Sequence, residues 1–191
     1  MRLLIVRHGE TEGNLGSILA GPEDSLNSNG KAQAQALSES LKNERIEAIF
    51  SSPYSRARET AEAIAKNHQD AQFIVDNDLR EMELGSYLNK KYDEVDWEKM
   101  PPDVEPRTST YARAKKAIER ALAKYPAGTV VFVSHNAMNK AAIRFLRGWD
   151  ANDRKPIPQD NTAVTIFEVS EKGNKEILFN STKHLETMPK G

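Results

Sequence analysis

Two apolar runs of the chain end in side chains that suit chemistry on a phosphate group. Arg7 and His8 follow the run at 3–6, and His135 follows the run at 129–134. A neutral imidazole nitrogen can attack phosphorus, while a guanidinium charge binds phosphate oxygens in a matching planar geometry. Gly9, next in the chain, lets the backbone turn close to a ligand. These residue types favour nucleophilic attack by His8 on a phosphate.

A third apolar run supplies further groups of the same kind. The run at 46–51 ends in Ser51-Ser52-Pro53, and Arg56 and Arg58 follow in the first turn of a predicted helix. One of these arginines is expected to face solvent. Two histidines and one or two arginines at the ends of neighbouring strands would form a pocket for a dianion, because guanidinium groups and helix N-termini both bind phosphate.

The elements that must position these groups alternate between strand and helix. Apolar runs predict buried strands, and apolar residues at helical spacing predict helices. The predicted strands are 3–6, 46–51, 73–75 (possibly an edge), 129–134, 162–169 and 176–180; the predicted helices are 31–41, 55–67, 105–125 and one after His135. This order predicts an α/β fold: a three-layer αβα sandwich with a mostly parallel central sheet and helices on both faces. Parallel strands end on one side, so the polar groups should converge there.

The bulk composition excludes several classes of protein. The chain has 191 residues, 38% of them hydrophobic, with a formal net charge of −1 and no cysteine. We expect one domain over 1–191. A near-neutral chain is not typical of nucleic-acid binders, and without cysteine there are no disulfides or thiolate metal sites. No stretch approaches a membrane span or a signal sequence, so no membrane partner and a cytoplasmic location are expected.

Two irregular segments are candidates for substrate contact. The polar loop at 10–30 is longer than most connections, and Asn27, Ser28 or Asn29 can cap the helix after it. The segment at about 82–104 reads as a small lid or as a loop packed on its own side chains. Four side chains of the second segment, together with Tyr54, could form an apolar wall for a leaving group or serve only loop packing. The four are Tyr87, Tyr92, Trp97 and Met100.

Five segments, in order from Arg2 to about Val169, resemble the histidine phosphatase superfamily, the phosphoglycerate-mutase-like proteins. The segment L-I-V-R-H-G-E-T-E-G-N at 4–14 resembles its R-H-G-[ED]-[ST] signature. The other four are Gly21 with Leu26, Gly30, Gln33 and Ala34; S-S-P-Y-S-R-A-R-E-T-A at 51–61; L-R-E-M-E-L-G at 79–85; and V-F-V-S-H-N at 131–136.

The resemblance implies a role for each matching residue. His8 would be the nucleophile and Glu81 the general acid and base. The remaining site residues would bind the phosphate: Arg7, Asn14, Arg56, His135 and Asn136. Arg56 matches the motif, which leaves Arg58 a structural role. The arginines and a protonated His135 would neutralise charge on the phosphoryl oxygens, so no metal and no cofactor are implied. The second nitrogen of His8 would bond to a backbone carbonyl near Gly9.

Within the family, the sequence favours a phosphomonoesterase that uses a phosphohistidine and acts on a small phosphorylated metabolite. The stretch between Glu81 and His135 is much shorter than the insert expected in the mutases. Met82 and Glu83 stand where the mutases have an arginine. A mutase primed by a bisphosphoglycerate is the alternative. The natural substrate is not apparent from the sequence.

Two alternatives come from other classes. A non-catalytic phospholigand sensor would usually lack the nucleophile or the acid, and this chain has both. A metallohydrolase that uses His8, His135 and Glu10 would place Arg7 beside a divalent cation, where it repels the metal. His68 and His184 have no polar company and are expected at the surface.

Two further points concern specificity and assembly. Asn136 stands where the family usually has glycine, and it adds bulk and a donor at the pocket edge. Edge strands would allow a homodimer, although no residue pattern favours one.

Overall fold

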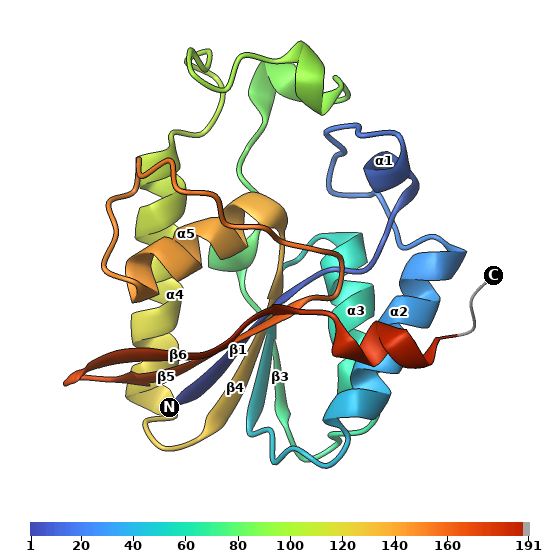
Figure 1. Cartoon of the computed structure of the whole chain (residues 1–191), viewed down its shortest axis with the longest axis vertical. Helices are drawn as coiled ribbons and strands as arrows, with labels where there is room; N and C mark the ends of the chain where they lie inside the picture. The colour runs from blue at the N-terminus through green and yellow to red at the C-terminus, as the bar shows by residue number, and fades with distance from the viewer. Residues whose placement is uncertain (189–191) are drawn as a thin grey trace.

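A six-stranded sheet forms the centre of the protein, whose computed structural model describes residues 1–188 (Figure 1). The order is β3-β2-β4-β1-β5-β6, with β1 at Arg2–Arg7, β2 at Ala48–Ser51, β3 at Gln72–Val75, β4 at Thr129–Ser134, β5 at Val164–Ser170 and β6 at Gly173–Ser181. The first four strands in this order are parallel to one another, β5 is antiparallel to β1, and β6 is antiparallel to β5. The predicted mostly parallel sheet is confirmed, with β3 at the edge; positions 189–191 of the predicted domain lie outside the described residues.

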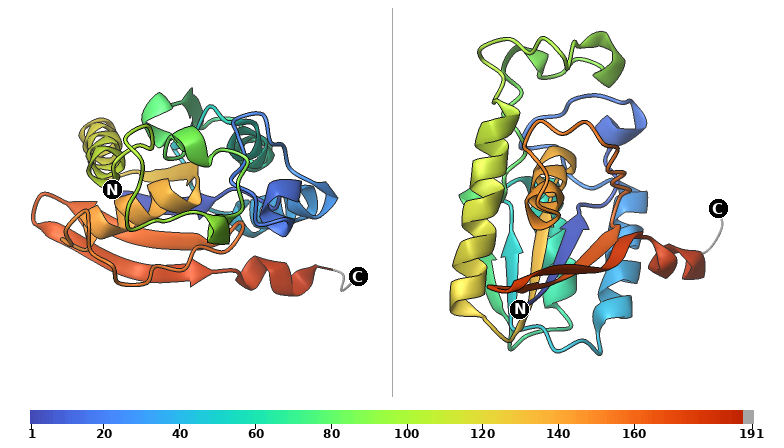
Figure 2. Two further views of the ribbon diagram at one scale, coloured as in Figure 1. Left: turned by 90° about the horizontal axis from the view of Figure 1, so that it is seen from above. Right: turned by 60° about the vertical axis from the view of Figure 1, so that its left-hand side comes forward.

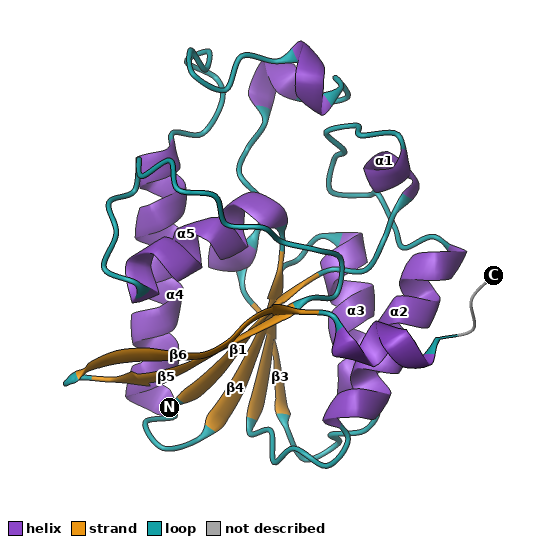
Figure 3. Ribbon diagram, in the orientation of Figure 1, coloured by secondary structure: helices purple, strands orange, loops and turns teal. Residues whose placement is uncertain are grey.

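Two pairs of helices cover the two faces of the sheet (Figure 3). The helices are α1 at Glu12–Leu15, α2 at Ser28–Leu41, α3 at Ser55–Ala65, α4 at Arg107–Lys124 and α5 at Asn136–Leu146. Short 3₁₀ turns lie at Asn77–Leu79, Gly85–Tyr87, Tyr92–Glu94 and Lys183–Thr187. Within residues 1–188, no helix combines the length and the hydropathy that crossing a membrane requires.

Several boundaries differ from the predicted ones by a few residues. Helix α2 begins at Ser28 rather than at 31, because the side chain of Asn27 accepts a hydrogen bond from the Gly30 N–H at 2.8 Å and caps it. Helix α3 ends at Ala65 rather than 67. Strand β6 begins at Gly173, three residues before the predicted start, because its hairpin with β5 is tighter than expected.

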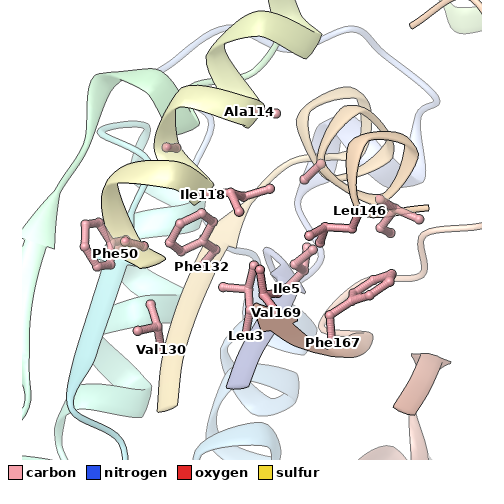
Figure 4. Packing of buried hydrophobic residues seen from close by; sticks show 14 of the residues in the cluster. Leu3, Ile5, Phe50, Ala114, Ile118, Val130, Phe132, Leu146, Phe167 and Val169 are labelled. Atoms are coloured by element: carbon pink, nitrogen blue, oxygen red, sulfur yellow. The ribbon is translucent and has the colours of Figure 1, made fainter. Parts of the chain in front are cut away.

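The core lies in two layers because side chains alternate along each strand. Leu3 and Ile5 of β1 point toward α4 and α5, where they pack with Phe132 (Figure 4). Leu4 and Val6 point the other way, toward α2 and α3. Since β1 and β4 are covered on both faces, their continuous apolar runs are explained.

A close backbone approach joins the end of β1 to the start of α2. A Cβ on Gly30 would lie 2.0 Å from the Glu10 carbonyl oxygen, and a Cβ on Gly9 would lie 2.6 Å from the Gly30 carbonyl oxygen. The sequence explained Gly9 by a turn near a ligand. The structure gives a different reason, which is that no side chain fits between these two backbone segments.

Gly30→Ala is expected to lower the free energy of unfolding by about 1–3 kcal/mol, because the new methyl group must displace the backbone at Glu10. Chemical denaturation measures the change. Gly21→Ala is the control, since its Cβ would meet only Leu88, at 3.6 Å, and should change stability by less than about 0.5 kcal/mol. Equal stability of the two variants would contradict the proposed constraint.

Candidate active site

A cavity of about 710 Å³ opens at the carboxyl ends of the parallel strands. Arg7 of β1 is directly opposite Ser134 of β4, and Ser51 of β2 is opposite Val133, so the residues that follow these strands lie side by side. Six of the seven predicted site residues line the cavity: Arg7, His8, Asn14, Arg56, Glu81 and Asn136. The seventh, His135, lies beneath the cavity, with its ring 5.2 Å from that of His8.

The imidazole of His8 is held in one tautomer. Its Nδ1 lies 2.7 Å from the carbonyl oxygen of Gly9, which can only accept, so Nδ1 carries the proton. Its Nε2 accepts a hydrogen bond from Nε of Arg56 at 3.2 Å. Burial, together with the charges of Arg56 and Arg7, holds the pKa of His8 well below its ordinary value. His8 is therefore neutral near pH 7 and presents a lone pair on Nε2.

Two arginines stand beside His8 with carbonyl partners in place of carboxylates. Arg56, in the first turn of α3, donates from Nη1 to the Gly21 carbonyl at 2.7 Å. Arg7 donates from Nη1 to the Gln159 carbonyl at 2.5 Å, and its buried Nε has no partner among the described residues. A carbonyl orients a guanidinium without neutralising it. The site thus has a high positive charge that is available to an anion.

His135 is expected to be protonated beside a bound phosphoryl group, and its surroundings favour the neutral ring when no phosphate is present. Burial and the charge of Arg56 hold its pKa well below the ordinary value. Its Nε2 lies 2.7 Å from Oγ of Ser52, and its Nδ1 has no partner within residues 1–188. Desolvation and the two nearby arginines disfavour an imidazolium here until an anion binds.

Asn14 is positioned by a small network on the other side of His8. Its Oδ1 accepts hydrogen bonds from the Thr11 N–H at 3.2 Å and from Nδ2 of Asn161 at 3.0 Å. Asn161 also donates to the His8 carbonyl at 3.0 Å. With its oxygen occupied in this way, Asn14 presents its amide N–H groups toward a ligand.

Glu81 lies against the N-terminus of α5. Its Oε2 accepts from the Ala137 N–H and its Oε1 from the Met138 N–H, both at 3.3 Å. These two N–H groups belong to the first turn of α5, where backbone donors have no partner within the helix, and they orient the Glu81 side chain. Asn136, the first residue of α5, has a buried Oδ1 without a partner in the described part of the chain. Both side chains border the cavity.

Residues 82–104, here called the roof segment, arch above the ends of the strands toward the loop that follows α1 (Figures 1 and 2), and Met82, Tyr92 and Trp97 of this segment line the cavity. The Leu19 N–H donates to the Lys90 carbonyl at 2.9 Å, and the Tyr92 N–H donates to the Ser17 carbonyl at 2.9 Å. Met82, Tyr87 and Val104 form its own small apolar core. Both interpretations of this segment therefore apply, because it packs on itself and also covers the site.

The proposed apolar wall is only partly present. Tyr92 and Trp97 line the cavity, whereas Tyr87 and Met100 pack inside the roof segment. Tyr54 lies against the ring of His135, at 5.2 Å between centroids.

The remaining charged candidates have structural positions. Arg58 is exposed and pairs with Glu62 at 2.8 Å, as expected of the surplus arginine. The surface prediction for His184 is wrong, because its Nε2 lies 2.9 Å from Oγ1 of Thr162 in a buried contact. His68 is half-buried. Within residues 1–188, no three His, Asp or Glu side chains are grouped to hold a metal.

Sequence reasoning missed several groups that position the site. Thr60 accepts from the Gly9 N–H at 3.0 Å and donates to the Arg56 carbonyl at 2.8 Å, which links the two sides of the pocket. Gln159 and Asn161 come from the loop before β5. The position of Ser52 at a strand end was a usable signal, but the loop residues carried none.

His8 and His135 are expected to titrate below pH 6.5, since burial and the adjacent guanidinium groups disfavour the imidazolium. Histidine proton NMR measures both pKa values, with His8→Ala and His135→Ala for assignment. Inorganic phosphate should raise both pKa values, because a dianion favours positive neighbours. Unfolded histidines bind protons near pH 6.5, so these two residues also cause stability to fall as pH falls through and below that value.

Ordinary pKa values without phosphate, or no response to phosphate, would contradict this electrostatic description of the site.

Comparison with known proteins agrees with the geometry. The family model described as histidine phosphatase superfamily (branch 1) matches residues 3–182. Phosphoserine phosphatase 1 of Hydrogenobacter thermophilus is 29% identical over 201 residues, which span 97% of this chain and 94% of that protein. The uncharacterized phosphatase PhoE of Bacillus subtilis is 30% identical over 95% of both chains.

Solved structures show the same similarity over the whole fold. The phosphoserine phosphatase of Entamoeba histolytica, solved in complex with 3-phosphoglyceric acid, has a TM-score of 0.85 and 27% identity. The alignment covers 96% of this chain and 98% of that one. Family model, relatives and structures agree: the chain belongs to the histidine phosphatase superfamily.

Proposed function

We propose that this phosphatase hydrolyses phosphomonoesters of small metabolites through a phosphohistidine formed on His8. The observation that carries the proposal is the fixed tautomer of this residue, with Nδ1 on the Gly9 carbonyl and the lone pair of Nε2 facing Nε of Arg56, a donor that a phosphate oxygen would take over. A nucleophile of this kind must be neutral and aligned before the substrate arrives. The relatives named as phosphatases of small metabolites support this substrate class.

Phosphate binding in this proposal relies on the cations and amides around His8. Arg7 and Arg56 would bind the equatorial oxygens, and Asn14 and Asn136 would donate from the cavity wall. As the dianion enters, its charge favours the protonated form of His135, which then adds a third cation beneath the phosphate. No metal ion or organic cofactor is part of this scheme.

The reaction would proceed in two in-line displacements. In the first, Nε2 of His8 forms a bond to phosphorus as the ester P–O bond breaks, and Glu81 transfers a proton to the departing oxygen. In the second, Glu81 removes a proton from a water molecule that attacks the phosphohistidine, which releases phosphate and restores His8.

Transfer to water is favoured over transfer to a second metabolite. Met82 directly follows Glu81, where the mutases carry their arginine, and it is an apolar residue buried in the roof segment. Glu83, the next residue, pairs with Arg80 at 2.9 Å. Neither Met82 nor Glu83 supplies the cation that the mutases have directly after the acid. A mutase primed by a bisphosphate is the alternative outcome of the activity test.

A cytoplasmic place of action and a homodimer are also part of the proposal. Both remain expectations from the sequence, and the edge strands β3 and β6 would allow pairing between two copies.

His8→Ala is expected to reduce hydrolysis of 4-nitrophenyl phosphate by about 10³-fold or more, because no other group replaces the attacking nitrogen. Both proteins are assayed with a chelator present, and rapid acid-free quenching with labelled substrate should trap a phosphohistidine only in the wild type. His68→Ala, which lies outside the cavity, is the matched control. Full activity in His8→Ala, or activity that the chelator abolishes, would rule out this mechanism.

Glu81→Gln is expected to reduce kcat by about 10²–10⁴-fold on alkyl phosphates, whose leaving oxygen needs a proton. The rate of the first displacement should fall less with 4-nitrophenyl phosphate as the substrate, because nitrophenolate leaves without protonation. The comparison of kcat for the two substrates by steady-state kinetics tests the assignment. Equal and small losses on both would show that Glu81 only positions the N-terminus of α5.

A further inference from the structure

The cavity continues past the phosphate-binding residues into a second region of positive charge. Its lining there includes five cationic side chains: Arg107, Lys140, Arg144, Arg154 and Lys155. Among the described residues that line this end, Glu98 is the carboxylate. The whole chain has a formal net charge of −1, so the excess of cations is a property of this cavity and not of the composition.

Helix α5 connects the two regions. Asn136, Lys140 and Arg144 follow one another at intervals of four residues, which places them on one face, and all three line the cavity. At 1.5 Å per residue, each interval corresponds to about 6 Å along the helix axis. The first of the three is beside the phosphate site. Lys140 is then one turn away from that site and Arg144 is two turns away.

The cations of this region differ in whether an acid neutralises them. Arg154 pairs with Glu98, and Lys155 pairs with Asp153 at 3.1 Å. Lys140 makes no hydrogen bond or ion pair with the described residues. Lys140 as a whole is half-buried, and its ammonium group remains available to a ligand.

The two inner arginines likewise have carbonyl partners only. Arg144 donates from Nε to the Asp153 carbonyl at 3.0 Å, and Arg107 donates from Nη2 to the Trp97 carbonyl at 2.8 Å. These contacts orient the guanidinium groups but leave further N–H donors and the full charge for another partner.

The positive charges also repel one another. Burial and the charges of Arg144 and Arg7 lower the pKa of Lys140, against an opposing effect of Glu81. Burial and the charges of Arg107 and Arg154 lower the pKa of Arg144. Such an arrangement is unfavourable while it is empty, and a bound anion relieves it.

We propose that the substrate carries a second anionic group, a carboxylate or a further phosphate, which binds between Lys140 and Arg144 with Arg107 facing it. This proposal rests on the proposed function, since the reacting phosphate must lie at His8. The spacing along α5 sets the size of the ligand. A carboxylate close to the ester would reach Lys140, whereas a phosphate at the far end of a sugar would reach Arg144 and Arg107.

The test measures binding without turnover, in the His8→Ala background, by isothermal titration calorimetry. The ligands are 3-phosphoglycerate, phosphoserine, fructose 1,6-bisphosphate and, as the ester with one anionic group, glucose 6-phosphate. The measured quantity is the ratio of affinities between each doubly anionic ligand and glucose 6-phosphate. The His8→Ala protein without a further substitution should bind a doubly anionic ligand more tightly than glucose 6-phosphate.

Lys140→Met and Arg144→Met should each reduce that preference by about tenfold to a hundredfold, because each removes one charge-assisted contact. A larger effect of Lys140→Met marks a carboxylate ligand, and a larger effect of Arg144→Met marks a distant phosphate. Lys140→Arg keeps the charge and should keep the preference. Lys31→Met removes an exposed charge outside the cavity and should leave the ratio unchanged.

Two results would overturn the proposal. One is an equal loss of affinity for glucose 6-phosphate and the doubly anionic ligands, which would place Lys140 and Arg144 at the reacting phosphate. The other is no preference for any second anion in the background protein. Since turnover is not measured, failure of the phosphohistidine mechanism would appear only in the assays of His8→Ala against wild type.

Discussion

The parallel pairing of β1 with β4 is the constraint from which the rest of the site follows. Its register sets Arg7 opposite Ser134, so the two histidines that come next lie with their rings 5.2 Å apart. Parallel strands require crossover helices, and here those helices cover both faces and start beside the strand ends. One side of the sheet thereby collects His8, the arginines and the N-terminus of α5.

Several positive charges close together in a buried site repel one another, and two features of this site limit that repulsion. The arginines donate to carbonyl oxygens, as Arg7 does to Gln159 and Arg56 does to Gly21, so they are oriented while their charge remains available. The imidazoles stay neutral, because desolvation and nearby guanidinium groups disfavour a further proton. The empty site is thus prepared for a dianion and not for a cation.

In the proposed function, residues around the phosphate-binding centre select among phosphate esters. The roof segment pairs with the loop after α1 and covers the cavity, and the cavity-lining face of α5 extends the positive charge away from His8. Relatives that share the fold at a TM-score of 0.85 include an enzyme solved with 3-phosphoglyceric acid. A common phosphate site with variable surroundings explains how one fold serves different metabolites.

The sequence by itself determined the order of strands and helices, the three strand ends with reactive side chains and the family, because these depend on local patterns and on ordered motifs. It also distinguished Arg56 from Arg58. Only the tertiary structure decided the neutral state of His135, the burial of His184 on Thr162 and the contacts of Gln159 and Asn161. The charge of a histidine and the partner of a loop residue depend on distant segments, and no pattern within a short window of residues specifies those.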